Sequence, residues 1–184
     1  MGSPSIVTLG YLFSRMSPFI IVCYFVLQSM FNQNLKGVFY LAGVLLACFI
    51  NSLVVGFVTG PIGEGREEVC NMIEGLDIPV GQTILGFTFA YLCYIISKYK
   101  MWSTNSFTLV IFPVLIISDM IWNLKNSCAG GSALALSLAM GVGLGYCWGM
   151  IINKVDPELQ FFNGISNKSV CSRPNKMTYR CRLK

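Results

Sequence analysis

The chain has 184 residues, of which 54% are hydrophobic and only 11% are charged, with a formal net charge of +5. Soluble domains carry about 25% charged residues, so this composition predicts an integral membrane protein and excludes an ordinary soluble domain. The sequence contains no histidine, which excludes histidine as a general base or as a metal ligand.

Five apolar segments predict an all-α, multi-pass transmembrane bundle over residues 1–153, because a spanning helix needs about 20 apolar residues. The first segment, 17–31, is short unless it includes flanking residues such as Phe13 and Met16. Pro113 predicts a kink in the fourth segment. In chain order the five expected spans are 17–31, 38–58, 79–97, 107–122 and 133–152.

The charged residues between these spans predict the orientation of the chain. With five spans, the face that carries the 60–78 and 123–132 loops has three cations, and the face that carries the 154–184 tail has ten. The positive-inside rule places the second face in the cytosol or its equivalent. The two ends also differ in charge: five acids and one arginine give the loop a net −4, and seven cations and two acids give the tail a net +5.

The acidic 60–78 loop leads into the third span through Pro79-Val80-Gly81-Gln82, and Pro79 marks a helix start. Over roughly residues 51–149, the order of a polar loop, this motif, a further span and a glycine-rich helix resembles the type 2 phosphatidic acid phosphatase family. That family has Pro-Ser-Gly-His at the helix start, with the histidine as general acid. Here Val80 and Gln82 stand in the places of the serine and the histidine.

The other catalytic motifs of that family are also missing. Arg66 is followed by Glu67 where Arg-Pro is wanted, and residues 125–135 contain neither the nucleophilic histidine nor its aspartate. An acidic loop would also repel phosphate. Catalysis by that mechanism is therefore excluded, and we expect a protein that is not an enzyme and that uses no metal and no cofactor.

The fifth span carries a packing signal, because small residues recur along it every four positions. Small residues at this spacing let helix backbones approach closely in a membrane. We expect this row to lie inside the chain's own bundle, and association between copies is the alternative. The main row is Ala133, Ser137, Gly141, Gly145 and Gly149, and an adjacent row is Ala135, Ala139, Gly143 and Cys147.

Asp119 is the one acidic residue within an expected span, and an intramembrane carboxylate is a candidate functional residue. It lies about one turn from the expected helix end, with Asn123 four residues later and Lys125 nearby. Interfacial snorkelling or capping is the favoured interpretation. A small transporter or channel is the alternative, which Asp119, Pro113 and the glycine-rich helix favour.

In the basic tail, Cys171 and Cys181 flank a Pro-Asn turn signal. Their spacing suits a small disulfide-closed hairpin, and Thr178-Tyr179 has strand character. The alternative is a disordered basic tail attracted to anionic lipid. Cys70 and Cys128 form a second possible disulfide pair, on the opposite face.

The Cys-Ser-x-Pro-x-Lys-x-x-Tyr-x-Cys ending is similar to the tails of small multi-span membrane proteins of giant icosahedral DNA viruses, the chlorovirus type among them. This resemblance implies a structural minor capsid protein in the virion inner membrane, beneath the capsid shell. Its expected partners are the lipid bilayer and capsid or other membrane-associated proteins, without sequence-specific nucleic-acid binding. A degenerate lipid-phosphatase-like protein that binds lipid is a further alternative. The candidate contact residues are Glu64, Glu67 and Glu68 in the loop, and Arg173, Lys176 and Arg180 in the tail.

The charge difference between the two ends generates a first prediction. Replacing the three candidate glutamates of the loop by glutamine is expected to weaken binding of a partner protein and to reduce the salt dependence of that binding. Neutralising the three candidate cations of the tail is expected to leave partner binding unchanged. We expect the loop to make the specific contact, because it is longer and contains proline, glycine and apolar residues that can pack on a partner. Co-purification at increasing salt measures both, and the reverse result would mean that the faces are assigned backwards.

Overall fold

A computed structural model of the chain describes residues 6–59, 79–103, 105–125, 128–161, 170–172 and 180–182. Side chains are described at residue 13 and from residue 16 onward, except in the two strands. The helices are α1 (Ile6–Phe31), α2 (Lys36–Thr59), α3 (Val80–Lys98), α4 (Ser106–Lys125) and α5 (Gly131–Val155). They are followed by the 3-10 turn η2 (Pro157–Leu159) and the strands β1 (Val170–Ser172) and β2 (Arg180–Arg182).

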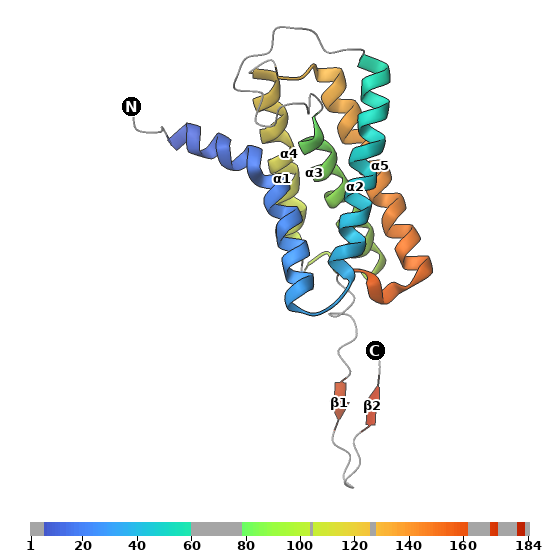
Figure 1. Ribbon diagram of the computed structural model, residues 1–184. Helices are drawn as coiled ribbons and strands as arrows, with labels where there is room; N and C mark the ends of the chain where they lie inside the picture. Colours follow the sequence, from blue (N-terminus) through green and yellow to red (C-terminus); the bar gives the residue numbers. More distant parts are fainter. Residues whose placement is uncertain are drawn as a thin grey trace.

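Four of these helices, α2 to α5, are long and apolar enough to cross a membrane. They coincide with four of the five expected spans. The first expected span forms only the second part of α1, which contains Pro18 and bends away from the other helices toward its N-terminus (Figure 1). Its described apolar part, Met16–Phe31, is shorter than the other candidate spans. A helical bundle with four span-like helices is thus established, and the fifth span stays a prediction.

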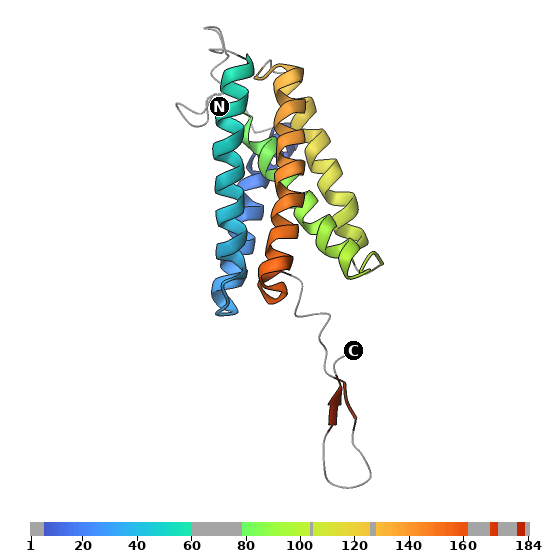
Figure 2. The ribbon, with the colours of Figure 1, turned by 90° about the vertical axis from the view of Figure 1, so that its right-hand side faces the viewer.

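Helix α3 occupies the centre of the bundle, with the other helices arranged around it (Figures 1 and 2). In the 18-residue apolar stretch of α3, 67% of the residues are buried, against 22–28% in the corresponding stretches of α2, α4 and α5. The mean hydropathy of the α3 stretch is also the lowest of the four, at 1.4. A central helix contacts protein on all sides, so it accommodates the threonines and the glutamine that α3 carries at 82, 83 and 88.

The closest contact in the bundle joins α5 to α3. A Cβ added at Gly145 would lie 2.8 Å from the Cα of Phe87, and one at Gly141 would lie 3.0 Å from the Cα of Thr83. One turn further along, a Cβ at Gly149 would lie 2.9 Å from the Tyr94 ring. The backbone of α5 therefore touches the backbone of α3 because glycine leaves no side chain between them.

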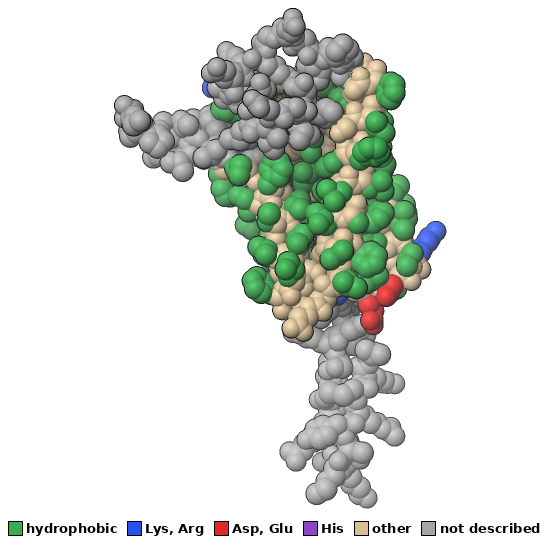
Figure 3. Space-filling model, viewed as in Figure 1, with side chains coloured by type: hydrophobic (Ala, Val, Ile, Leu, Met, Phe, Trp, Pro, Cys, Tyr) green, Lys and Arg blue, Asp and Glu red, His purple; other side chains and the backbone are tan. Residues whose placement is uncertain are grey.

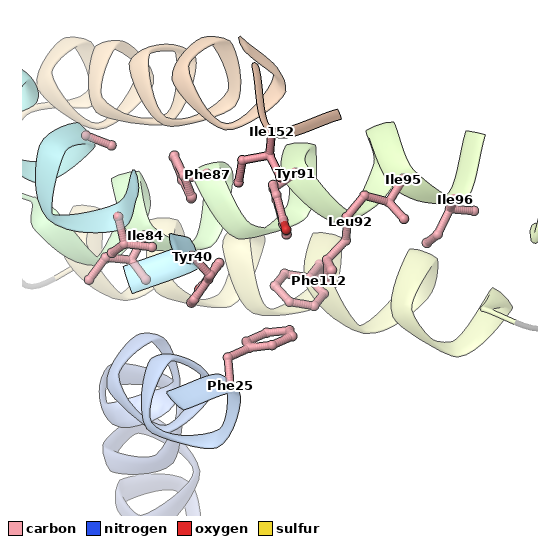
Figure 4. Packing of buried hydrophobic residues seen from close by; sticks show 12 residues of the cluster. Phe25, Tyr40, Ile84, Phe87, Tyr91, Leu92, Ile95, Ile96, Phe112 and Ile152 are labelled. Carbon is pink, nitrogen blue, oxygen red and sulfur yellow. The ribbon is translucent and has the colours of Figure 1, made fainter. Parts of the chain in front are cut away.

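Aromatic rings fill the space where α1 and α2 meet α3 (Figure 4). The Tyr40 ring lies 4.8 Å from that of Phe25 on α1, and 6.2 and 5.9 Å from those of Phe87 and Tyr91 on α3. The Thr88 hydroxyl donates to the Ile84 carbonyl at 2.7 Å, so in the 2.6 Å Tyr40–Thr88 bond the tyrosine is the donor. Tyr40 thus joins three helices by packing and by a buried hydrogen bond.

Helix α2 also contacts α5 through a tryptophan. The Trp148 indole donates from Nε1 to the Phe39 carbonyl at 3.1 Å. A Cβ added at Gly43 would lie 2.5 Å from that nitrogen and 2.7 Å from the Phe87 ring. Gly43 therefore provides the space in which the indole and the phenylalanine ring meet.

The outer surface matches a chain that sits in a bilayer. Hydrophobic side chains cover the flank of the bundle, and acidic side chains lie at its lower end beside a basic one (Figure 3). The ends of α2, α3 and α5 that carry Lys36, Lys98 and Lys154 lie at this same end of the bundle (Figures 1 and 2). Lysines gathered at one end of the bundle are the charge distribution expected of a membrane protein with a cation-rich face.

Beyond that end, β1 and β2 form a two-stranded antiparallel ladder (Figures 1 and 2). Its register pairs Val170 with Arg182, Cys171 with Cys181 and Ser172 with Arg180. Thr178 and Tyr179, for which strand character was predicted, lie outside the described residues. The second strand is instead described from Arg180 onward.

A methyl group at the α3–α5 contact is expected to destabilise the bundle. Gly145→Ala places a Cβ against the Phe87 backbone, which cannot move aside like a flexible side chain, and overpacking of this kind costs about 1–3 kcal/mol. Gly143→Ala on the same helix is the matched control, because nothing lies within 4 Å of its added Cβ. Thermal unfolding of both variants in detergent measures the difference, and equal stability of the two would contradict the glycine contact.

Candidate functional site

The candidate site is the buried contact between α3 and α4 around Asp119. The Asp119 side chain is only 2% exposed, and its Oδ2 accepts a hydrogen bond from the Nε2 of Gln82 at 2.8 Å. The same nitrogen donates to the Ile116 carbonyl at 3.1 Å. The snorkelling interpretation of Asp119 is therefore wrong, because a snorkelling carboxylate reaches solvent, whereas this side chain is buried against α3.

Asn123, the neighbour on which the capping interpretation depended, bonds elsewhere. Its Nδ2 donates to the backbone carbonyl of Asp119 at 2.7 Å, not to the carboxylate. Asn123 is itself 2% exposed. Its amide nitrogen thus back-bonds within its own helix, in the apolar interior.

The start of α3 explains why Gln82 reaches Asp119. The helix begins at Val80 with Pro79 as its N-cap, so Gly81 and Gln82 lie in its first turn. A Cβ added at Gly81 would lie 3.4 Å from the Cγ of Pro18 and 3.7 Å from the Oδ2 of Asp119. Residues of α1 and of α4 therefore both lie beside the first turn of α3.

This geometry gives the phosphatase-like motif a structural role. In the phosphatidic acid phosphatase pattern the fourth residue of the motif is a catalytic histidine. In this chain that residue, Gln82, is fully buried and donates two hydrogen bonds to α4. These two hydrogen bonds join α4 to α3.

Further polar atoms lie in the interior near the α3–α5 contact. The Thr83 hydroxyl donates to the Ser137 carbonyl at 3.3 Å, which joins α3 to α5. The Oε1 of Gln82, the Oγ of Ser137 and both amide atoms of Asn51 are buried without a hydrogen-bond partner. Unsatisfied buried polar atoms destabilise a fold by about 1–3 kcal/mol each, so a polar interior of this kind calls for a functional or packing reason.

The structure separates the two rows of small residues on α5. All five residues of the main row are buried, and the row lies on the face of α5 that contacts α3. The adjacent row is exposed along its whole length, and an added Cβ at Gly143 meets nothing. The main row thus lies inside the chain's own bundle. Its members are Ala133, Ser137, Gly141, Gly145 and Gly149.

The remaining candidate residues lie mostly outside the described part of the chain. Glu64, Glu67 and Glu68 are not described, and neither are Arg173 and Lys176. For the other three only the backbone is described: Arg180 and Cys181 in β2, and Cys171 in β1.

Of the second possible disulfide pair, one half is described. Cys128 is disulfide-bonded, and its partner's side chain lies outside the described residues. Cys23, Cys48, Cys93 and Cys147 are free.

Sequence reasoning missed the Gln82–Asp119 pair, although both residues were singled out. The signal that could have found it is chemical: the one carboxylate and the one glutamine of the central spans both need partners in an apolar interior. The Tyr40–Thr88 bond was missed because neither residue stands out from its apolar surroundings.

Comparison of the chain with protein-family models, with curated proteins and with solved structures finds no match.

The Gln82–Asp119 pair is expected to be energetically coupled. Gln82→Leu and Asp119→Leu each remove one partner, and each is expected to lower the free energy of unfolding by about 1–3 kcal/mol because the remaining polar group is left buried. The double variant is expected to lose less than the sum, by about 0.5 kcal/mol or more. Unfolding of all four proteins in detergent gives the coupling, and strictly additive losses would show that the two side chains act independently.

Proposed function

We propose that the protein is a structural multi-span membrane protein that anchors an extramembrane protein assembly to a bilayer. The observation that carries this proposal is the β1–β2 ladder beyond the end of the bundle, in which Cys171 stands opposite Cys181. An isolated two-stranded hairpin is marginally stable in water. A cross-link between facing cysteines would fix it as a small rigid element that protrudes from the membrane.

The backbone register makes that cross-link geometrically reasonable. Facing residues of an antiparallel pair have Cα atoms about 4.5 or 5.5 Å apart. Disulfides join residues whose Cα atoms are about 4.4–6.8 Å apart. The two distance ranges overlap, so the ladder needs no backbone movement to accept a disulfide at this position.

The packing of the bundle supports a scaffold. Glycines of α5 contact α3 through backbone, Tyr40 and Trp148 join three helices, and Gln82 bonds α3 to α4. A protein that transmits force between a membrane and a protein layer needs helices that keep fixed positions. A bundle held by short-range contacts of this kind meets that need.

The finer proposal concerns where such an anchor works. The Cys171–Cys181 segment carries the resemblance to membrane proteins of giant icosahedral DNA viruses, and this is the segment in which β1 and β2 pair. We therefore propose a minor capsid protein in the inner membrane of a virion, with capsid proteins as its partners. The tail and the acidic loop are the two candidate contact regions.

Two cross-linking chemistries applied to purified particles test the anchoring role. An amine-reactive reagent reports on the tail, which contains Lys168, Lys176 and Lys184, whereas the 60–78 loop has no lysine. A carbodiimide joins the loop's glutamates to lysines of a neighbouring protein. Cross-links from either region to a capsid component are expected, and a chain that yields links only to itself under both reagents would sink the proposal.

Transport is the second candidate function, and the polar interior favours it. Unpartnered polar atoms of Gln82, Ser137 and Asn51 lie in the core, and Gln82 contacts a buried carboxylate. Ion flux through liposomes that contain the purified protein decides between the two candidates. The anchoring proposal predicts flux no higher than in empty liposomes, and flux that Asp119→Asn abolishes would establish transport instead.

Cys171 and Cys181 are expected to be joined in the mature protein. Peptide mapping without reduction should recover them in one linked species, because the ladder places them opposite each other. Cys23 and Cys147, which are free and exposed on the bundle, provide the control and should react with an alkylating reagent in the same sample once it is denatured. Recovery of alkylated Cys171 and Cys181 would refute the cross-linked hairpin.

A further inference from the structure

A cavity of about 660 Å³ opens between α1 and α4, at the end of the bundle where α1 turns into α2. Pockets for small molecules fall between about 300 and 1,000 Å³, with mostly apolar walls and a few polar groups at defined positions. This cavity has that composition. Its apolar wall includes Tyr24, Phe25, Leu92, Ile111, Phe112 and Phe161.

The inner wall of the cavity belongs to the packed core and is therefore preformed. The Phe25 ring lies edge-on to the Phe161 ring at 4.4 Å and near the Tyr40 ring at 4.8 Å. Phe25 on α1 faces Phe112 on α4, with Leu92 of α3 beside them (Figure 4). Phe25, Phe112 and Leu92 are each at most 6% exposed. A ligand that enters between α1 and α4 meets a fixed apolar surface.

The mouth of the cavity opens on the apolar flank of the bundle. Ile20 and Tyr24 of α1 are 47% and 59% exposed, and Phe107 of α4 is 76% exposed. In a chain whose span-like helices cross a bilayer, residues of this kind face the acyl chains of lipids. A molecule that reaches the cavity through this mouth comes from the hydrocarbon region.

One end of the cavity is polar and carries a single charge. Lys36 lies there with Asn32, Asn34 and Asn105, and none of the described residues that line the cavity is acidic. Lys36 makes no ion pair with the described carboxylates. The amides of Asn32 and Asn105 donate to backbone carbonyls, at 2.7 and 3.1 Å. The ammonium group of Lys36 is therefore the charged donor available to a ligand.

A second polar group at this end is an acceptor. Gln28 lines the same cavity, and its Oε1 is buried beneath the cavity surface without a hydrogen-bond partner among the described residues. A buried acceptor is stabilised by a donor such as a hydroxyl. A ligand that satisfies both groups has an anionic phosphate for Lys36, a hydroxyl for Gln28 and an apolar chain for the aromatic wall.

We propose that this cavity binds one anionic glycerophospholipid of the bilayer, with a headgroup that carries hydroxyls. An acyl chain lies between α1 and α4 against Phe25 and Phe112, and the phosphate lies at Lys36. The inference rests on the membrane placement of the chain and not on the anchoring role, so each can fail without the other. A bound lipid at this place would fill the space between α1 and α4 at this end of the bundle, and the two helices contact each other elsewhere along their lengths.

Native mass spectrometry of the full chain, purified in detergent and titrated with lipid, tests the proposal. Phosphatidylglycerol is expected to bind in one copy per chain, more tightly than phosphatidylcholine with the same acyl chains. Lys36→Gln is expected to weaken phosphatidylglycerol binding by about fivefold, the effect of about one headgroup contact. Lys154→Gln is the control: it neutralises a cation at the same end of the bundle that does not line the cavity.

A second pair of variants tests the acyl-chain part of the site. Ile111→Trp fills the cavity and is expected to abolish the one-to-one complex, whereas Ile117→Trp adds the same bulk to an exposed position of the same helix and should preserve it. If Ile111→Trp does not fold, the Lys36→Gln variant decides alone, because Lys36 is only partly buried and tolerates the change.

Three outcomes would overturn the proposal. Equal binding of phosphatidylglycerol and phosphatidylcholine, with no effect of Lys36→Gln, would refute recognition of an anionic headgroup. Displacement of the lipid by soluble glycerol phosphate would show that the acyl chain contributes nothing. A dimer without bound lipid would mean that a second copy covers the cavity instead.

Discussion

The contact between the backbones of α3 and α5 is the constraint on which the rest of the structure depends. In a bilayer, apolar side chains gain little by leaving lipid for protein, so helices associate through close van der Waals contact and hydrogen bonds. Gly141 and Gly145 allow that contact by leaving the α5 backbone directly against Thr83 and Phe87. With α3 fixed against α5, the remaining helices pack around this pair.

Polar side chains then determine how the other helices sit on this pair. Gln82 joins α3 to α4 by bonding both a side chain and a backbone carbonyl of that helix. Tyr40 joins α2 to α3 through the Thr88 hydroxyl. Each bond is directional and buried, so it specifies one rotation of a helix where lipid-like apolar packing would accept several. The buried carboxylate thus has a structural explanation even before any chemistry is assigned to it.

The bundle leaves its two ends and one flank for contact with other molecules. The β1–β2 ladder stands beyond the cation-rich end, with its two cysteines in register. The cavity between α1 and α4 opens on the apolar flank near the same end and contains Lys36. The ladder belongs to one of the two candidate protein-contact regions, and it lies near the proposed lipid contact but in a distinct place, one outside the membrane and one within it.

The sequence by itself determined the class of the fold and the places of four helices, because long apolar runs have one stable form in lipid, in which every backbone group is bonded within the helix. It also indicated the row of small residues from Ala133 to Gly149, because a four-residue repeat marks one face of a helix. Only the tertiary structure decided which helix that face meets, that α3 is central, and that Asp119 points inward to Gln82. Periodicity fixes the face on which a residue lies, but the direction of that face depends on the neighbouring helices. Residues far apart in the chain, such as Gln82 and Asp119 at 37 positions, come together only when those helices pack.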